Sequence, residues 1–107
     1  MKSFVDITGA SGAIYRFDAI ASAADVPAVA GNFIFARLGR HAVEVVCCGL
    51  TMNLNEMIGR WGSEIAPGDT QGIFIRLNTL RKARDREHKD IFDKHQPELV
   101  VGDHDDR

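Results

Sequence analysis

The fold of this chain is constrained most by two short strand-like runs near its middle. The runs are Gly31–Arg37 and Val43–Cys48, both rich in β-branched and aromatic residues, with a predicted turn near Gly39–His41. Because apolar residues occupy successive positions in both runs, both faces of each strand should be buried. The pattern therefore predicts two central, paired strands that are covered by helices on each side.

A change of hydrophobic period after the second run predicts a short amphipathic helix over Asn53–Trp61. Apolar side chains recur there at positions i, i+3, i+4 and i+7, namely Leu54, Met57, Ile58 and Trp61. Asn53 followed three residues later by Glu56 resembles a capping box, and Gly62 is a typical helix terminator. We expect Trp61 and the rest of this stripe to lie in the core.

The outer parts of the chain predict further strands. An N-terminal β-hairpin is indicated by a turn at Gly9–Gly12 followed by an alternating strand over Tyr15–Ile20. After a break at Pro67–Asp69, the alternating segment Gly72–Asn78 predicts a third core strand. A last edge strand is expected at Leu99–Val101.

The longest predicted helix covers Thr79–His95 and should end at Gln96–Pro97. Its inward stripe is predicted to consist of Leu80, Ala83, Glu87 and Ile91, with basic side chains around the rest.

Together these elements predict an α+β fold in which a small, mainly antiparallel central sheet is flanked by helices. A chain of 107 residues with 45% hydrophobic and 26% charged residues can bury an adequate core without a disulfide or a metal. We expect a single domain over residues 1–107, with its core at about 4–101 and a solvated acidic tail at 102–107.

Several classes of protein do not fit the composition. No run approaches the ~20 apolar residues of a membrane span, and residues 1–6 do not lead into the apolar core of a signal peptide, so we expect a cytoplasmic protein with no membrane partner. Cys47 and Cys48 are neighbours on a strand and should point to opposite faces, so we expect two small core residues and no mutual disulfide.

The segment Thr8–Tyr15 imitates the glycine fingerprint of dinucleotide-binding proteins. Tyr15 stands where that motif needs a glycine for close helix packing, and no helix pattern follows. A hairpin turn explains these glycines better.

The paired strands and their flanking residues resemble the motifs of the GIY-YIG nuclease family, over about residues 9–100. The likeness is greatest to a bacterial subgroup of short, stand-alone domains that open with a hairpin like Gly9–Phe17. The glycine-tyrosine strand of the family falls on Gly31–Phe33, its second tyrosine strand on Cys47–Gly49, and its Thr-x-Asn-Leu on Thr51–Leu54. The arginine of the family aligns with Met57 and its metal-binding glutamate with His88; Val100 replaces a later asparagine.

This resemblance implies a mechanism whose key groups are replaced here. The tyrosines of the family hold the attacking water, its arginine stabilises charge on the phosphate, and its glutamate carries one Mg²⁺. Phe33 has no hydroxyl, Cys47 is small, and Met57 cannot contact phosphate electrostatically. His88 is a poor ligand for Mg²⁺, which prefers oxygen. We therefore expect a domain with no catalysis and no cofactor.

Two residues support an alternative, a weak or divergent Mg²⁺-dependent endonuclease. Arg60 lies one helical turn beyond Met57, and a one-residue shift in the long helix would put Glu87 at the metal position. Glu87 fits equally well an ion pair with Arg60 or with Arg76.

Basic residues are concentrated in residues 76–94, which carry seven basic and four acidic side chains although the formal net charge of the chain is −2. Arg76, Arg81, Arg84 and Lys89 are candidates for contacts with nucleic-acid phosphates. A solvated helix interleaved with Asp85, Asp90 and Asp93 is the simpler interpretation. The leading hypothesis is an inactive GIY-YIG-like binding module whose partner is a nucleic acid, bound weakly, or a protein; a purely structural or homodimeric interaction domain is a further alternative.

Overall fold

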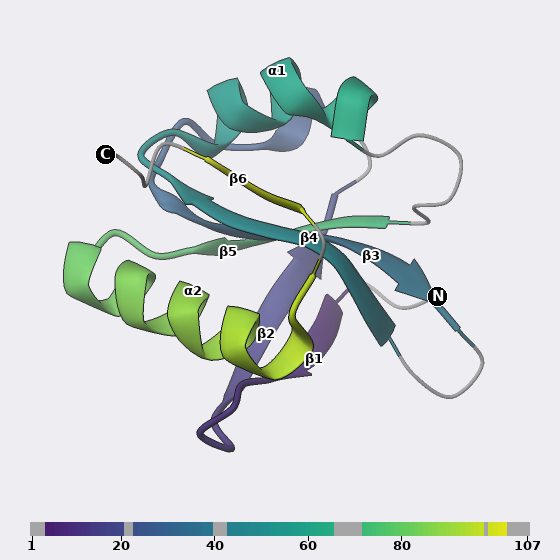
Figure 1. Ribbon diagram of the computed structural model, residues 1–107. Coiled ribbons are helices and arrows are strands. Elements are labelled where there is room, and N and C mark those ends of the chain that lie inside the picture. Colours follow the sequence, from purple (N-terminus) through teal and green to yellow (C-terminus); the bar gives the residue numbers. More distant parts are fainter. Residues whose placement is uncertain (1–3, 21–22, 40–42, 66–71, 98, 103–107) are drawn as a thin grey trace.

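A curled six-stranded sheet with one helix on each face forms the framework of the protein (Figure 1). The computed structural model describes residues 4–20, 23–39, 43–65, 72–97 and 99–102. The strands are β1 (Phe4–Thr8), β2 (Ile14–Ala19), β3 (Gly31–Leu38), β4 (Val43–Thr51), β5 (Gly72–Leu77) and β6 (Leu99–Gly102). The helices are α1 (Leu54–Ile65), α2 (Arg81–His95) and a short 3₁₀ turn, η1 (Ala23–Asp25).

The strand order β1-β2-β5-β3-β4-β6 puts β3 at the centre of the sheet. Five strands pair antiparallel, and β6 adds to the edge of β4 in parallel. In the register, Gly31 lies opposite both Thr51 and Leu77. The residues just beyond these three positions therefore meet at one end of the sheet, where the Asn78 N–H donates to the Ala30 carbonyl at 3.0 Å. The predicted α+β class and mainly antiparallel sheet are confirmed.

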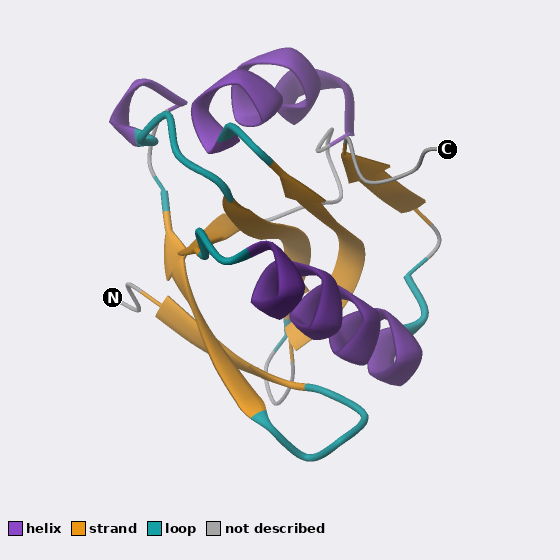
Figure 2. Cartoon of the chain, turned by 90° about the vertical axis from the view of Figure 1, so that its left-hand side faces the viewer, coloured by secondary structure: helices purple, strands orange, loops and turns teal. Residues whose placement is uncertain are grey.

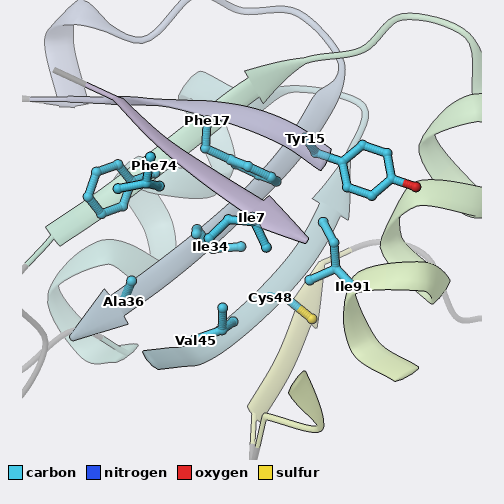
Figure 3. Packing of buried hydrophobic residues seen from close by; sticks show 10 residues of the cluster. Ile7, Tyr15, Phe17, Ile34, Ala36, Val45, Cys48, Phe74 and Ile91 are labelled. Carbon is cyan, nitrogen blue, oxygen red and sulfur yellow. The ribbon is translucent and has the colours of Figure 1, made fainter. Parts of the chain in front are cut away.

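Alternation along the central strands divides the core into two layers. They lie on opposite sides of the sheet, which stands between α1 and α2 (Figure 2). The layer beneath α1 consists of Val26, Phe33, Phe35, Cys47, Leu54, Met57, Ile58 and Ile75. The other layer lies between α2 and the curled sheet, including its β1–β2 hairpin (Figure 3). It includes Ile7, Phe17, Ile34, Cys48 and Ile91. Burial of β3 and β4 on both faces is thus as predicted.

Helix α1 begins where the sequence predicts and continues beyond Gly62 to Ile65. Its predicted capping box is half formed, because the Asn53 side-chain oxygen accepts the Glu56 N–H at 3.0 Å while the Glu56 carboxylate accepts from Arg60. Gly62 therefore does not end the helix, in contrast to the prediction. The side chains of residues 61–65, including Trp61, lie outside what the structure describes.

Helix α2 differs from its prediction at its first turn. Leu80 is the residue before the helix and is 71% exposed, so it does not belong to the inward stripe. The inward position is taken by Arg84, which is 3% exposed and lies with Glu87 and Ile91. The helix ends as predicted, at Gln96, which is left-handed (φ 49°) and donates its N–H to the Phe92 carbonyl.

Several predicted features fall on residues outside those described. They are most of the turn at 39–41, the break at 67–69, and the acidic tail at 103–107. Among the described residues, no helix has both the length and the apolarity that a membrane span requires.

Candidate functional site

The positions that align with the GIY-YIG tyrosines and arginine lie together, but inside the core. Phe33 and Cys47 are fully buried and Met57 is 6% exposed, all in the layer beneath α1. The ring of Phe33 packs against that of Phe35, with centroids 5.9 Å apart. These side chains all belong to one buried apolar cluster.

The remaining aligned or near-aligned residues lie elsewhere. Arg60 is on α1, exposed, and its guanidinium donates to the Glu56 carboxylate at 3.4 Å. Glu87 and His88 are on α2, which covers the opposite face of the sheet (Figure 1). The structure therefore does not bring Arg60, Glu87 and His88 into one site with Phe33 and Cys47.

Glu87 is engaged by a buried polar network on the α2 side of the sheet. Its Oε1 accepts from Arg76 Nε at 2.7 Å and from Asn78 Nδ2 at 3.0 Å. Asn78 Nδ2 also donates to Asn32 Oδ1, and Asn32 Nδ2 donates to the Arg84 carbonyl. Of the two ion pairs that the sequence left open for Glu87, the one with Arg76 is formed. No cluster of three or more His, Cys, Asp or Glu side chains that could hold a metal occurs among the described residues.

The four candidate phosphate contacts do not form one continuous basic face. Arg76 is used by Glu87, and Arg84 is buried. Lys89 pairs with Asp93 at 3.0 Å, and Arg81 lies 3.9 Å from Asp85. The expectation that Arg84 is a surface residue is wrong, because Arg84 lies three residues before Glu87 and seven before Ile91 and so shares the inward stripe of α2.

A cavity of about 620 Å³ lies at the N-terminal end of α2, which we call the Arg84 pocket. It forms where the ends of β3, β4 and β5 meet, as the shared register of Gly31, Thr51 and Leu77 requires. Its lining comes from the sheet end and from one side of α2: Ala30, Leu50, Met52, Thr79, Arg81, Arg84, Asp85 and His88. Of the predicted site residues, His88, Arg81 and Arg84 are thus brought together here.

The first turn of α2 gives this pocket a positive end. The N-cap residue, Leu80, makes no side-chain cap hydrogen bond, and the first turn has no acidic residue. The first N–H groups of any helix lack an intrahelical acceptor, and the helix dipole is positive there. The first helical hydrogen bond that closes runs from the Arg84 N–H to the Leu80 carbonyl, so the N–H groups of residues 81–83 precede it. Such an end favours a bound anion.

Arg84 adds a second, independent indication of an anion. Its Nη1 donates to the Asn78 carbonyl at 3.1 Å, and its Nη2 donates to the Met52 sulfur at 3.2 Å. A thioether is a weak acceptor for so strong a donor. Arg84 Nε is buried and has no hydrogen-bond partner among the described residues. The guanidinium is therefore held in the wall of the pocket with donor capacity that its protein partners do not fully use.

The glycine-rich turn of the N-terminal hairpin is anchored to α2 by Asp90. The Asp90 carboxylate accepts from the Ser11 N–H at 2.8 Å, and from the Ser11 and Tyr15 hydroxyls at 2.6 Å each. Figure 3 shows the Tyr15 hydroxyl pointing toward α2. A Cβ at Gly9 would collide with the Asp90 carboxylate, which explains a glycine at this position. The hairpin that the sequence predicts, in place of a dinucleotide loop, is confirmed.

The hydrogen bonds at Asp90 change the acidity of both partners. The Ser11 hydroxyl, followed by the Tyr15 hydroxyl, lowers the pKa of Asp90. Burial, followed by the hydrogen bond to Asp90, raises the pKa of Tyr15. In the core, burial raises the pKa of the Cys48 thiol to about 12, so this cysteine stays protonated near neutral pH. Cys47 and Cys48 lie in opposite layers, as the strand alternation predicts, and form no disulfide with each other.

No protein-family model matches this chain, and no curated protein or solved structure matches it.

Proposed function

We propose that this protein is a non-catalytic binding module, derived from a GIY-YIG-like domain, that holds a phosphate group in the Arg84 pocket. The observation that carries the proposal is the combination of an uncapped, positively charged helix start with a buried arginine whose Nε has no partner among the described residues. Both line or border one cavity. Each feature alone is common, but together they put an uncapped helix start and a guanidinium at one cavity, and groups of both kinds bind oxyanions.

The loss of catalysis is supported by the surroundings of the aligned positions. Phe33, Cys47 and Met57 are buried in the layer between the sheet and α1, where a phosphodiester has no access. The alternative endonuclease would need Glu87 and Arg60 in one site. That alternative is disfavoured because Glu87 is committed to Arg76 and Asn78, and because Arg60 is on the helix across the sheet.

A single phosphate group fits the pocket better than a long stretch of duplex DNA. Arg76 and Lys89, two of the candidate backbone contacts, already have carboxylate partners. Each lysine or arginine contact to a duplex phosphate contributes a log-log salt slope of about −0.9. We therefore expect weak DNA binding with a slope that corresponds to only one or two such contacts. If the protein binds neither phosphate nor DNA, its partner is instead a protein or a second copy of the chain.

The proposal is tested by titrating the protein with inorganic phosphate in a calorimeter. Arg81→Gln, which removes an exposed charge at the pocket, should weaken binding by about tenfold. Arg86→Gln removes the same charge from an exposed residue of α2 that does not line the pocket, and should change affinity by less than about twofold. Equal losses in the two variants, or no binding to the unaltered protein, would contradict the proposed site.

A nuclease assay tests the loss of catalysis separately. Purified protein with Mg²⁺ should not cleave duplex or branched DNA. Cleavage that is abolished by Glu87→Ala but retained by His88→Ala would instead support the endonuclease that uses Glu87 and Arg60.

A further inference from the structure

The Arg84 pocket has an apolar side as well as a cationic side. Ala30, Leu50 and Met52 contribute one wall from the sheet end, whereas the charged residues of the lining all belong to α2. Met52 is 65% exposed, and the exposed Leu80 stands between two lining residues, Thr79 and Arg81. A ligand that covers large apolar side chains at the edge of a concave site gains binding free energy from their burial.

We infer that the ligand of this pocket is a small phosphate monoester with an apolar body. The inference rests on the proposed phosphate site and adds the chemistry of the rest of the ligand. The phosphate lies at the first turn of α2 beside Arg84, and the apolar body covers Met52 and the adjacent wall. On binding, a phosphate oxygen replaces the Met52 sulfur as acceptor for Arg84 Nη2, which frees the thioether to pack on the ligand.

A phosphate suits the donors better than a carboxylate does. The start of α2, Arg81 and Arg84 together offer several N–H donors at the pocket, and a phosphate presents more acceptor oxygens to such a set than a carboxylate does. Asp85, also in the lining, offsets part of the positive charge. Asp85→Asn should therefore tighten binding of any phosphate probe.

The size of the pocket suits a small molecule. Its volume of about 620 Å³ lies within the range of about 300–1,000 Å³ that is typical of small-molecule sites. Such a space accommodates a phosphate and a single ring system.

The test compares phenyl phosphate with glycerol 3-phosphate, which has the same charged group on a polar body. Phenyl phosphate should bind at least about tenfold more tightly than glycerol 3-phosphate or inorganic phosphate. Met52→Thr should remove most of this preference, which is measured as the ratio of the affinities of that variant for phenyl phosphate and for inorganic phosphate. Ile14→Thr is the matched control, because Ile14 is also 65% exposed but lies on β2, outside the pocket lining, and this variant should retain the full preference.

The outcomes separate this inference from the proposed function. Equal affinities for the two phosphate esters would overturn the apolar body and leave phosphate binding intact. Benzoate that binds as tightly as phenyl phosphate would overturn the choice of phosphate over carboxylate. Lack of binding by every probe, including inorganic phosphate, would overturn both proposals together.

Discussion

The two faces of the central sheet share the same strands but differ in the chemistry that they bury. Beneath α1, the core is an apolar layer around Phe33 and Cys47. On the α2 side, one end of the face is apolar around Phe17 and Ile34, and the other end carries the polar network and the Arg84 pocket. Three of the four buried polar or charged side chains in the described residues, Asn32, Arg84 and Glu87, belong to that network.

This difference follows from the alternation of side chains between the two faces of each strand. Odd-numbered positions 33 and 47 point toward α1, and even-numbered positions 32, 34 and 48 point toward α2. A motif read along the strands at positions 33 and 47 therefore falls wholly into the apolar layer. The polar groups available for binding lie on the other face, where His88 is the one aligned position that lines the pocket.

The largest expected effect is at the centre of the apolar layer. Phe33→Ala should lower the free energy of unfolding by about 3–5 kcal/mol, because it leaves a cavity among fully buried side chains. Phe33→Tyr, which restores the family's hydroxyl, should cost about 1–3 kcal/mol because the hydroxyl is buried against apolar neighbours. Urea unfolding measures both. A Phe33→Tyr variant with an unchanged free energy of unfolding would show that this face is accessible to water.

On the α2 face, Arg84 should contribute far more than a surface cation. Arg84→Ala removes a buried aliphatic stem and the hydrogen bond to the Asn78 carbonyl, so the free energy of unfolding should fall by about 2–3 kcal/mol. Lys89→Ala breaks only an exposed pair with Asp93 and should cost less than about 0.5 kcal/mol. If the two variants lose similar amounts of unfolding free energy in the same urea experiment, the buried network does not stabilise the protein more than the helix surface does.

The two Glu–Arg pairs provide a matched comparison across the sheet. Glu87→Gln should cost about 1–2 kcal/mol, because Glu87 is buried while its partner Arg76 keeps partial access to water. Glu56→Gln weakens an exposed pair with Arg60 on α1 and should cost less than about 0.5 kcal/mol. A Glu87→Gln variant that is as stable as Glu56→Gln would show that the charge of Glu87 contributes no more to stability than that of an exposed glutamate.

The smallest expected effect is the pH dependence of the Asp90 anchor. The lowered pKa of Asp90 means that its stabilisation is complete above the ordinary value of 3.8 and is lost as the pH falls through the lower folded-state value. The stability difference between the unaltered protein and Asp90→Asn should therefore be larger at about pH 6 than at about pH 2, as measured by urea unfolding. A difference that does not change with pH would show that the charge of Asp90 has no role in holding the hairpin.

The sequence predicted the elements better than it predicted the site. Hydrophobic period located β3, β4 and the opposite orientations of Cys47 and Cys48, because alternation is a local property of a strand. Leu80 was misplaced because it continues a helical apolar spacing, whereas α2 starts at Arg81. Arg84 was misplaced because its charge favours the surface, although it shares the helical spacing of Glu87 and Ile91. No local signal indicated the pocket, because Asn78 and Thr79 are both favoured N-cap residues, whereas the structure puts Leu80 at the N-cap. The pocket itself depends on the register that aligns Gly31 with Thr51 and Leu77, a long-range feature that no local pattern contains.

The most direct test of the account is the map of backbone amide NMR shifts during a titration with inorganic phosphate. The account predicts the largest shifts at residues 79–84 and at Met52, where the α2 start and the sheet end form the pocket. It also predicts small shifts at Phe33, Cys47 and Met57, which lie beneath α1. Shifts concentrated at these three residues, with residues 79–84 unchanged, would contradict the assignment of binding to the α2 face.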